Sequence, residues 1–318
     1  MVDDTSASGV SPDETFALVG DETRLGILRT LGAAGEPLAF STLFERSEYD
    51  TTGNFSYHLE KLDGHFVTKT DDGCTLRQAG RRVVEAVVSG TVTDDPVLRR
   101  APTERSCPFC SAPIEVGYEQ ERVEMYCTEC PGIVRPEDPG DRSATEFGTL
   151  GAISLPPAGV QGRTPTELLD AADVWTNLDI LAISAGVCPR CAGSVEHAVT
   201  VCEDHDASQG TCDRCGRRYA ALFGFECATC HYAEDGIAIV CLLATTELLS
   251  FLTEHGANPL DPETLAPGSL ANYGEELRSL DPLRVELTFT VDGATLTMTV
   301  DEDVSLVDVT RGRDTESA

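Results

Sequence analysis

The chain has 318 residues, a formal net charge of −31 and a sequence pI of about 4.3, and 41% of its residues are hydrophobic. This length suggests two or three domains with ordinary cores. No stretch reaches the roughly 18–20 apolar residues of a membrane span. The first residues are acidic and polar, without the apolar segment of a secretory signal, so we expect a cytoplasmic protein.

The charge of the chain is unusual in kind and in distribution. Lys61 and Lys69 are the only lysines, and all other cations except histidine are arginine. Strong acidity with few lysines is typical of halophilic proteins, and we interpret the composition as haloarchaeal in type. Residues 24–100 contain 10 Arg and Lys against 11 Asp and Glu, so the rest of the chain carries nearly all the net charge. A segment without excess negative charge is expected where a surface approaches a polyanion. The alternative is a compact domain with fewer acidic residues on its surface.

Residues 11–92 predict four helices, a β-hairpin and a fifth helix. Ser11, Pro12 and two acids are typical of a helix start, and Asp21 begins a second helix. A short third helix begins at Phe40, and a fourth spans residues 51–62. Alternating residues at 66–70 and 74–77 flank an Asp-Gly turn, which indicates a hairpin. The fifth helix is predicted from Gln78 to about Ser89.

The fourth helix carries a family resemblance. Residues 51–62, TTGNFSYHLEKL, resemble the recognition helix of arsenic-repressor-like (ArsR-like) winged helix-turn-helix regulators, and residues 23–31, TRLGILRTL, resemble their early helix. The resemblance covers about residues 12–92. It implies a helix in the major groove of double-stranded DNA, a hairpin over the backbone, and a homodimer on a pseudo-palindromic site. The metal-sensing cysteine motif of arsenic- and cadmium-responsive members is absent, and we interpret Cys74 as a packed core residue.

Polar side chains on this helix and lysines nearby are the candidate DNA contacts. Hydroxyl and amide groups can donate to bases or phosphates, and lysines suit phosphates. Phe55, Leu59 and Leu62 recur at helical spacing and are expected in the core. A solvated surface role is the alternative for each candidate, and His58 is left open between the two. The predicted contacts are Thr52, Asn54, Ser56, Tyr57, Lys61 and Lys69.

Six short-spaced ligand pairs are the strongest motif of the chain, and they use 11 of its 13 cysteines. Zn²⁺ prefers four Cys or His ligands, and a C-x2-C pair supplies two. After a polar segment at 91–106, the first two pairs flank alternating strands at 114–118 and 122–126. An antiparallel hairpin brings both pairs together, so residues 104–133 predict a zinc ribbon that needs metal to fold. Its ligands are Cys107, Cys110, Cys127 and Cys130.

Residues 164–256 predict a helix followed by a module with two zinc ions. The helix has a wide apolar face, expected to pack on its own module or to form a dimer interface. Two strands of matched length separate the ligand pairs, which favours nested pairing. The nested sets are Cys188, Cys191, Cys227 and Cys230 at one end, and Cys202, His205, Cys212 and Cys215 at the other. Sequential and interleaved pairing stay open, and an acid or a water could replace His205.

The last predicted part spans residues 257–310. Before it, residues 237–240 predict a strand and residues 242–255 a helix. Within it we expect a short helix near 270–278, a hairpin from 284 to 300 around an Asp-Gly turn, and a third strand at 304–309. The tail from 311 to 318 is expected to be disordered.

The sequence as a whole predicts an α+β protein. A winged helix-turn-helix (11–92) precedes a zinc ribbon (104–133), a helix with a two-zinc ribbon module (164–256) and a C-terminal β-hairpin region (257–310). Closed four-ligand sites and the absence of a catalytic metal motif indicate three structural zinc ions and no enzymatic activity. We therefore expect a DNA-binding transcriptional regulator without membrane contact. The alternative is a zinc-ribbon protein–protein adaptor or a general transcription-factor-like component.

Overall fold

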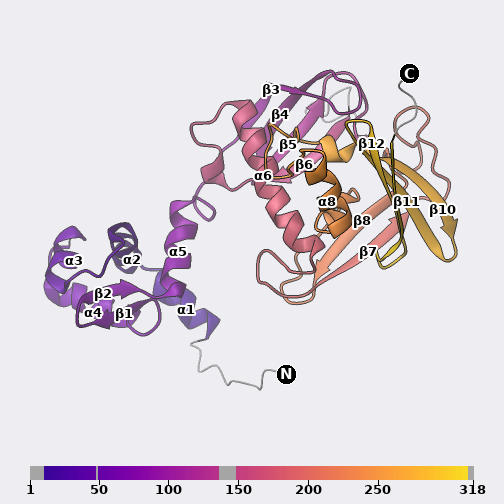
Figure 1. Cartoon of the computed structure of the whole chain (residues 1–318). Coiled ribbons are helices and arrows are strands. Elements are labelled where there is room, and N and C mark those ends of the chain that lie inside the picture. Colours follow the sequence, from indigo (N-terminus) through magenta and orange to yellow (C-terminus); the bar gives the residue numbers. More distant parts are fainter. Residues whose placement is uncertain (1–10, 48, 136–147, 314–318) are drawn as a thin grey trace. The chain divides into compact units, whose positions relative to one another are not determined.

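The chain consists of two compact units, residues 1–94 and 95–318 (Figure 1). The computed structural model describes residues 11–47, 49–135 and 148–313. Across these ranges the predicted mixed α+β class is confirmed, because helices occur together with four small antiparallel sheets. In the same ranges, no helix combines the length and the hydropathy needed to cross a membrane.

The N-terminal unit begins with helices whose starts follow local chemistry. Ser11 and Glu14 form a reciprocal capping box, and the Asp21 side chain accepts a hydrogen bond from the Arg24 backbone at 3.0 Å. Gly32 allows close packing of the second helix, since a Cβ there would lie 2.7 Å from Val84 Cγ1. The described elements are α1 (Pro12–Val19), α2 (Glu22–Ala34), α3 (Phe40–Arg46), α4 (Thr52–Leu62), β1 (Val67–Thr70), β2 (Gly73–Leu76) and α5 (Gln78–Val88).

The core of this unit lies between α2, α4 and the hairpin. Phe55, Leu59 and Leu62 are all buried, which confirms the face predicted from their spacing. Cys74 is also buried, and it forms an antiparallel bridge with Leu38 from the loop before α3. The two backbone hydrogen bonds of this bridge measure 3.0 and 2.8 Å. The chain at Leu38 thereby pairs with the hairpin as a third short β segment.

The C-terminal unit opens with a sheet whose strands lie in chain order. The strands are β3 (Leu98–Ser106), β4 (Pro113–Glu119), β5 (Arg122–Cys127) and β6 (Thr149–Ser154). The expectation of a polar linker at 91–106 was wrong for residues 98–106, which form β3. An edge strand buries only part of one face and needs few apolar residues, so its sequence resembles a linker. Strand β6 forms the opposite edge of the sheet from β3.

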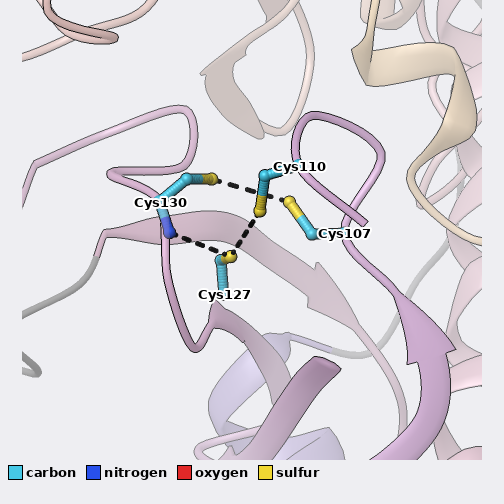
Figure 2. Close-up of side chains that lie close together, drawn as sticks. All are labelled: Cys107, Cys110, Cys127 and Cys130. Atoms are coloured by element: carbon cyan, nitrogen blue, oxygen red, sulfur yellow. Dashed lines mark hydrogen bonds between the residues drawn. The ribbon is translucent and has the colours of Figure 1, made fainter. Parts of the chain in front are cut away.

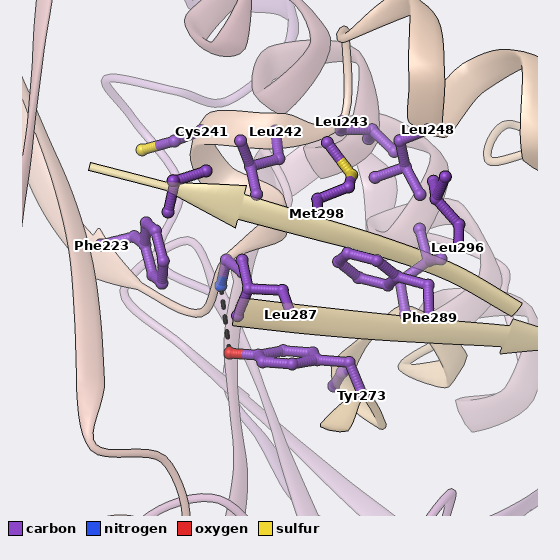
Figure 3. Close-up of a cluster of buried hydrophobic side chains, with 14 of the residues drawn as sticks. Phe223, Cys241, Leu242, Leu243, Leu248, Tyr273, Leu287, Phe289, Leu296 and Met298 are labelled. Carbon is purple, nitrogen blue, oxygen red and sulfur yellow. Dashed lines mark hydrogen bonds between the residues drawn. The ribbon is translucent and has the colours of Figure 1, made fainter. Parts of the chain in front are cut away.

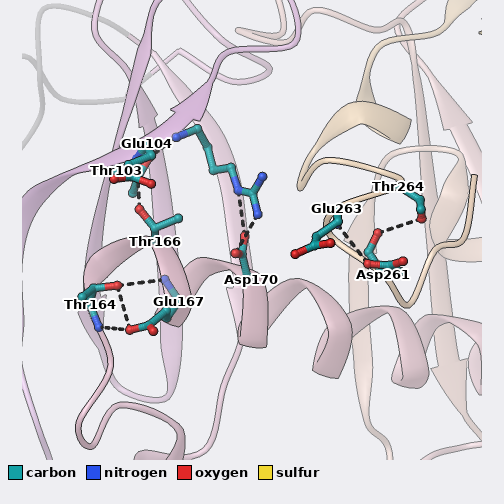
Figure 4. A network of polar contacts seen from close by, with 10 residues as sticks. Thr103, Glu104, Thr164, Thr166, Glu167, Asp170, Asp261, Glu263 and Thr264 are labelled. Atoms are coloured by element: carbon teal, nitrogen blue, oxygen red, sulfur yellow. Dashed lines mark hydrogen bonds and ion pairs between the residues drawn. The ribbon is translucent and has the colours of Figure 1, made fainter.

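Helix α6 (Pro165–Ser184) packs along this sheet against β3 and β6 (Figure 1). It starts with a capping box between Thr164 and Glu167. Arg105 of β3 donates two hydrogen bonds to the Asp170 carboxylate, at 2.9 and 2.7 Å, and the Glu104 backbone donates to Thr166 Oγ1 at 3.0 Å. Figure 4 shows Thr166 and Asp170 of α6 directed toward β3. These bonds fix the helix start to the edge strand.

The rest of the unit contains a second ribbon and a four-stranded sheet. Its elements are β7 (Val195–Val201), β8 (Ala221–Cys227), β9 (Ala233–Gly236), α7 (Ile239–Leu242), α8 (Thr246–Glu254), β10 (Gly274–Leu280), β11 (Leu283–Val291), β12 (Ala294–Val300) and β13 (Leu306–Arg313), with short 3-10 turns at Pro157–Gly159 and Ser269–Ala271. Strands β7–β9 form one antiparallel sheet and β10–β13 the other, each in chain order.

Three predictions in this region were wrong. No strand forms at 237–240, because strand β9 ends at Gly236 and helix α7 begins at Ile239. A short apolar run suits a buried helix as well as a strand. The helix expected near 270–278 is mostly strand β10. The tail was expected to be disordered from residue 311, but residues 311–313 belong to β13 and pair with Leu296, Thr295 and Ala294. Residues 314–318 lie outside the described residues.

One hydrophobic core joins two of the predicted parts. Figure 3 shows Leu287, Phe289 and Met298 of the C-terminal sheet packed beside Phe223 of β8 and Leu248 of α8. Each fully buried large apolar side chain contributes about 1.5–3 kcal/mol relative to exposure. Residues 257–310 therefore share their core with residues 219–252 and do not form a separate cluster.

Asp173 of α6 gives the fold a pH dependence that can be measured. Its carboxylate accepts a hydrogen bond from Asn177 Nδ2 at 3.1 Å, and burial raises the pKa of Asp173 to about 7. The folded chain therefore keeps a proton that the unfolded chain releases near pH 4. The stability this proton provides is full at low pH and is lost as the pH rises toward 7, by up to about 1.4 kcal/mol per pH unit.

We expect Asp173→Asn to weaken this pH dependence and to raise the unfolding midpoint at pH 8. The reason is that the wild-type chain must bury a carboxylate there, and the variant need not. Thermal unfolding followed by circular dichroism between pH 5 and 8 measures the effect. The exposed Asp303→Asn serves as the matched control and is expected to leave the profile unchanged. Parallel profiles for wild type and Asp173→Asn would contradict the prediction.

Candidate metal centres

Twelve Cys and His side chains converge in three groups of four in the described part of the chain. Within each group the candidate ligand atoms all lie within 4.8 Å of one another. The groups are those of the nested pairing, and neither the sequential nor the interleaved alternative fits them. They comprise Cys107, Cys110, Cys127 and Cys130; Cys188, Cys191, Cys227 and Cys230; and Cys202, His205, Cys212 and Cys215. Cys74 and Cys241 are buried elsewhere and join no group.

The sulfur–sulfur distances fit a shared metal ion. The Sγ atoms of Cys107 and Cys130 are 3.6 Å apart, and those of Cys110 and Cys127 are 3.4 Å apart (Figure 2). The corresponding distances in the second group are 3.7 and 3.5 Å. A disulfide would need about 2.05 Å, whereas thiolates around a tetrahedral zinc, each about 2.3 Å from the metal, lie about 3.8 Å from one another. None of these cysteines forms a disulfide in the described part of the chain.

Four of the ligand pairs share one backbone loop. Each loop has the same two backbone hydrogen bonds, at 2.8–3.1 Å. The N–H of the first cysteine donates to the carbonyl of the fifth residue after it, and the N–H of the fourth residue after it donates to the carbonyl of that cysteine. The residue after the second cysteine is left-handed in every case. These residues are Ser111 (φ 62°), Ala192 (φ 59°), Gly216 (φ 69°) and His231 (φ 57°).

This conformation carries information because three of the four residues are not glycine. A residue with a side chain loses about 1–2 kcal/mol in the left-handed region, so the surroundings must hold it there. A metal ion shared by the two cysteines would do so.

Backbone donors favour the thiolate, which is the form that binds metal, at Cys212 and Cys227, whereas burial raises the pKa of Cys107 and Cys202. The N–H of Cys130 donates to Cys127 Sγ at 3.2 Å, and that of Thr229 donates to Cys227 Sγ at 3.4 Å. Hydrogen bonds from the Cys230 and Thr229 backbone lower the pKa of Cys227 to about 6. In the third group, the backbone of Asp206 and Cys215 lowers the pKa of Cys212 to about 6.

His205 is arranged as a metal ligand through Nδ1. That atom lies 3.5 Å from Cys215 Sγ, which fits a nitrogen and a sulfur on one zinc ion. Its Nε2 lies 3.0 Å from the Arg218 carbonyl, so a proton on Nε2 would be donated there and would fix the tautomer. The other candidate histidines differ: His197 contacts the Ile183 carbonyl, and His231 faces Glu226.

We expect His205→Ala to reduce the metal content from three ions per chain to two, because three sulfurs alone hold the ion less tightly against a chelator. His231→Ala is the matched control and is expected to retain three ions. Elemental analysis after dialysis against a weak chelator measures both. Loss of an ion from the control, or three ions in His205→Ala, would contradict the assignment.

Each complete group offers four protein ligands to one ion. Four ligands fill a tetrahedral coordination sphere and leave no position for water or substrate. As arranged, the groups can stiffen loops and stabilise the fold.

The six predicted DNA contacts lie on α4 and the hairpin. Thr52, Asn54, Tyr57, Lys61 and Lys69 are exposed. Ser56 is half-buried, Lys61 Nζ lies 5.6 Å from the Tyr57 ring centroid, and Lys69 pairs with Asp63 at 3.6 Å. His58 is turned inward, with Nδ1 3.4 Å from the Asp21 carboxylate, so the structure does not place it with the exposed set.

Three exposed cations were missed by the sequence reasoning. Arg77, Arg81 and Arg82 lie at the start of α5, directly after β2. None of them forms an ion pair with another of the described residues, whereas Lys69 does. The signal that could have found them is the run of three arginines within six residues beside a predicted hairpin.

Comparison with known proteins gives two family matches. Residues 104–306 match a family described as a domain of unknown function (DUF7351), and residues 12–87 match another described as a domain of unknown function (DUF7347). The first match covers more than half of the chain and contains all three metal groups. No curated protein and no solved structure matches the chain.

Proposed function

The chain belongs to the DUF7351 family, and we propose that it is a DNA-binding transcriptional regulator of the ArsR-like winged helix-turn-helix type. In this proposal the N-terminal unit reads DNA with α4 in the major groove. The C-terminal unit is a set of ribbons held by three structural zinc ions. Zinc is the favoured metal because it prefers tetrahedral sulfur and nitrogen ligands.

The observation that carries the proposal is the two-sided character of α4. One side buries Phe55, Leu59 and Leu62, and the other exposes Thr52, Asn54 and Tyr57. None of the latter three side chains forms a hydrogen bond with another described residue, so their donors and acceptors are free for bases. Helix α3 precedes α4 by a short loop, and the hairpin with its Leu38 bridge follows, which is the element order of a winged helix.

The distribution of charge supports the same unit as the DNA-binding part. Residues 24–100 are nearly neutral in a chain of net charge −31. The exposed cations Lys61, Lys69, Arg77 and Arg81 lie on α4, on the hairpin and at the start of α5. Contacts from these cations to phosphates would position α4 in the groove.

A homodimer is part of the proposal. Phe16 of α1 is 75% exposed and Val88 of α5 is 71% exposed, and α1 buries none of its own residues. These apolar side chains offer a surface for a second copy of the chain. A two-fold dimer would present two copies of α4 to half-sites about one helical turn apart.

The alternative is a zinc-ribbon protein–protein adaptor. It is favoured by Trp175 and Leu178 of α6, which are 46% and 49% exposed side by side on one helix. A mobility-shift assay with duplex genomic fragments, competed by single-stranded DNA and by RNA, separates the two. Retention of discrete duplex fragments is expected for the regulator. Failure to retain any duplex, with metal bound and the chain folded, would favour the adaptor.

A further inference from the structure

A cavity of about 290 Å³ lies inside the C-terminal unit. It is bounded by α6, by β6 and by the β8–β9 ribbon, and residues 265–271 line it as well. Its size is close to the lower end of known small-molecule sites, which span about 300–1,000 Å³. Most of the wall is aliphatic or aromatic, including Leu150, Ile153, Ile180, Ile183, Tyr219 and Phe225.

Segments directly adjacent in sequence to each of the three metal groups form part of the cavity wall. Ile133 follows the first group, Arg217 lies two residues after Cys215 of the third, and Phe225 lies two residues before Cys227 of the second. The Cys212 N–H donates to the Arg217 carbonyl at 2.8 Å, and Arg217 forms a backbone bridge with Val134. The metal loops therefore fix the backbone from which the Arg217 side chain extends.

Arg217 is the residue of the wall with a buried side-chain nitrogen that lacks a hydrogen bond. Its Nε is buried without a hydrogen bond, and its guanidinium forms no ion pair with any described residue. Burial raises the pKa of Glu275, and the positive charge of Arg217 opposes that rise. The Glu275 carboxylate does not bond to Arg217, because it accepts hydrogen bonds from the backbone N–H groups of Ala220 and Ala221. A buried donor without an acceptor is costly, so an acceptor brought by a ligand is favoured here.

Three other polar side chains of the wall, Thr176, Asn177 and Arg122, already have partners. Thr176 Oγ1 exchanges hydrogen bonds with the Ser154 backbone at 3.0 and 3.2 Å. Asn177 donates to the Pro259 carbonyl at 2.7 Å, and Arg122 pairs with Glu234 at 2.9 Å. The side chains of Arg122 and Glu234 are partly exposed, so the cavity reaches the surface beside them.

We propose that this cavity binds a small carboxylate with an apolar body. A guanidinium has only donors, and its planar fork matches the two oxygens of a carboxylate. The apolar body would fill the space between Ile153, Ile180 and Phe225. Asp179 and Asp235 also line the wall and disfavour a second negative charge, which restricts the ligand to a monocarboxylate. This inference goes beyond DNA binding and does not depend on it.

Calorimetric titration of the full, metal-loaded chain tests the proposal at high KCl. The probes are octanoate, 1-octanol and octylamine, which share an apolar chain and differ in the head group. We expect saturable octanoate binding, with the alcohol and the amine at least about tenfold weaker, since a charge-assisted fork is lost. Arg217→Gln is expected to remove the preference for octanoate, and Arg217→Lys to reduce it. Arg214→Gln, an exposed arginine three residues away that is not in the wall, is expected to retain it.

Absence of saturable octanoate binding would overturn the proposal, as would equal binding of 1-octanol. The comparison of the three probes on the wild-type chain is decisive even if a variant unfolds. Octanoate affinity unchanged in a folded Arg217→Gln variant would also overturn it. Metal content and the unfolding midpoint, measured on every variant, show which variants are folded.

Discussion

Removal of metal is expected to unfold the C-terminal unit and to leave the N-terminal unit folded. The three groups hold the ends of both ribbons, and the shared core around Phe223 and Leu287 packs on strands that these groups position. Structural zinc contributes about 10–16 kcal/mol of apparent binding free energy in small zinc-finger peptides, which exceeds the stability of a typical domain. The N-terminal unit has its own core and contains none of the ligands.

Hydrogen exchange with mass spectrometry, before and after a strong chelator, measures this effect segment by segment. Amides of β4, β5, β7 and β8 are expected to lose protection, and those of α2 and α4 to keep it. Cys227→Ser is expected to release one ion and to expose β7–β9 first. The exposed Ser208→Ala is a matched control and is expected to keep all three ions. Persistent protection of the ribbons after complete metal loss would contradict a structural role.

Substitution of Asn54 is expected to abolish sequence-selective DNA binding. Asn54 is exposed on the first turn of α4, and a bidentate contact from an amide to a base accounts for about 1–3 kcal/mol of discrimination. Asn54→Ala, alone or with Tyr57→Ala, should therefore lower the affinity for a selected duplex about tenfold or more and leave non-specific binding intact. Competition mobility shifts with selected and scrambled duplexes measure the difference.

The lysines are expected to behave differently from Asn54. Lys61→Ala should weaken binding to all duplexes alike and reduce the dependence of log affinity on log salt by about one unit. Glu22→Gln on α2 serves as a surface control without effect. The composition predicts adaptation to high salt, where base contacts should carry more of the affinity than phosphate contacts do. Equal losses for selected and scrambled duplexes in Asn54→Ala would argue against α4 as the reading helix.

The metal groups could be predicted from the sequence because their information is local. A C-x2-C pair requires only four residues, and strand alternation between pairs determines which ends meet. The same holds for the N-terminal helices, where Ser11 and Asp21 give explicit start signals. His205 was identified by its place in the nested set, although nothing near it excluded the neighbouring acids.

The errors arose where tertiary contacts decide the structure. The polar segment at 98–106 is a strand only because β4 lies beside it, and residues 311–313 are strand only because β12 does. Residues 239–242 are helical because they pack against α6 and β8, whereas periodicity in so short a run is ambiguous. Arg217 could not be recognised from the sequence, because the wall around it comes from segments far apart in the chain.

Selection of bound DNA from fragmented genomic duplex tests the central claim most directly. The full, metal-loaded chain would be used at high KCl, with Asn54→Ala in parallel, and the retained fragments sequenced. The account predicts enrichment of a discrete, two-fold symmetric motif that the variant fails to retain. No enriched motif with the folded wild-type chain, or the same motif with the variant, would contradict DNA recognition by α4.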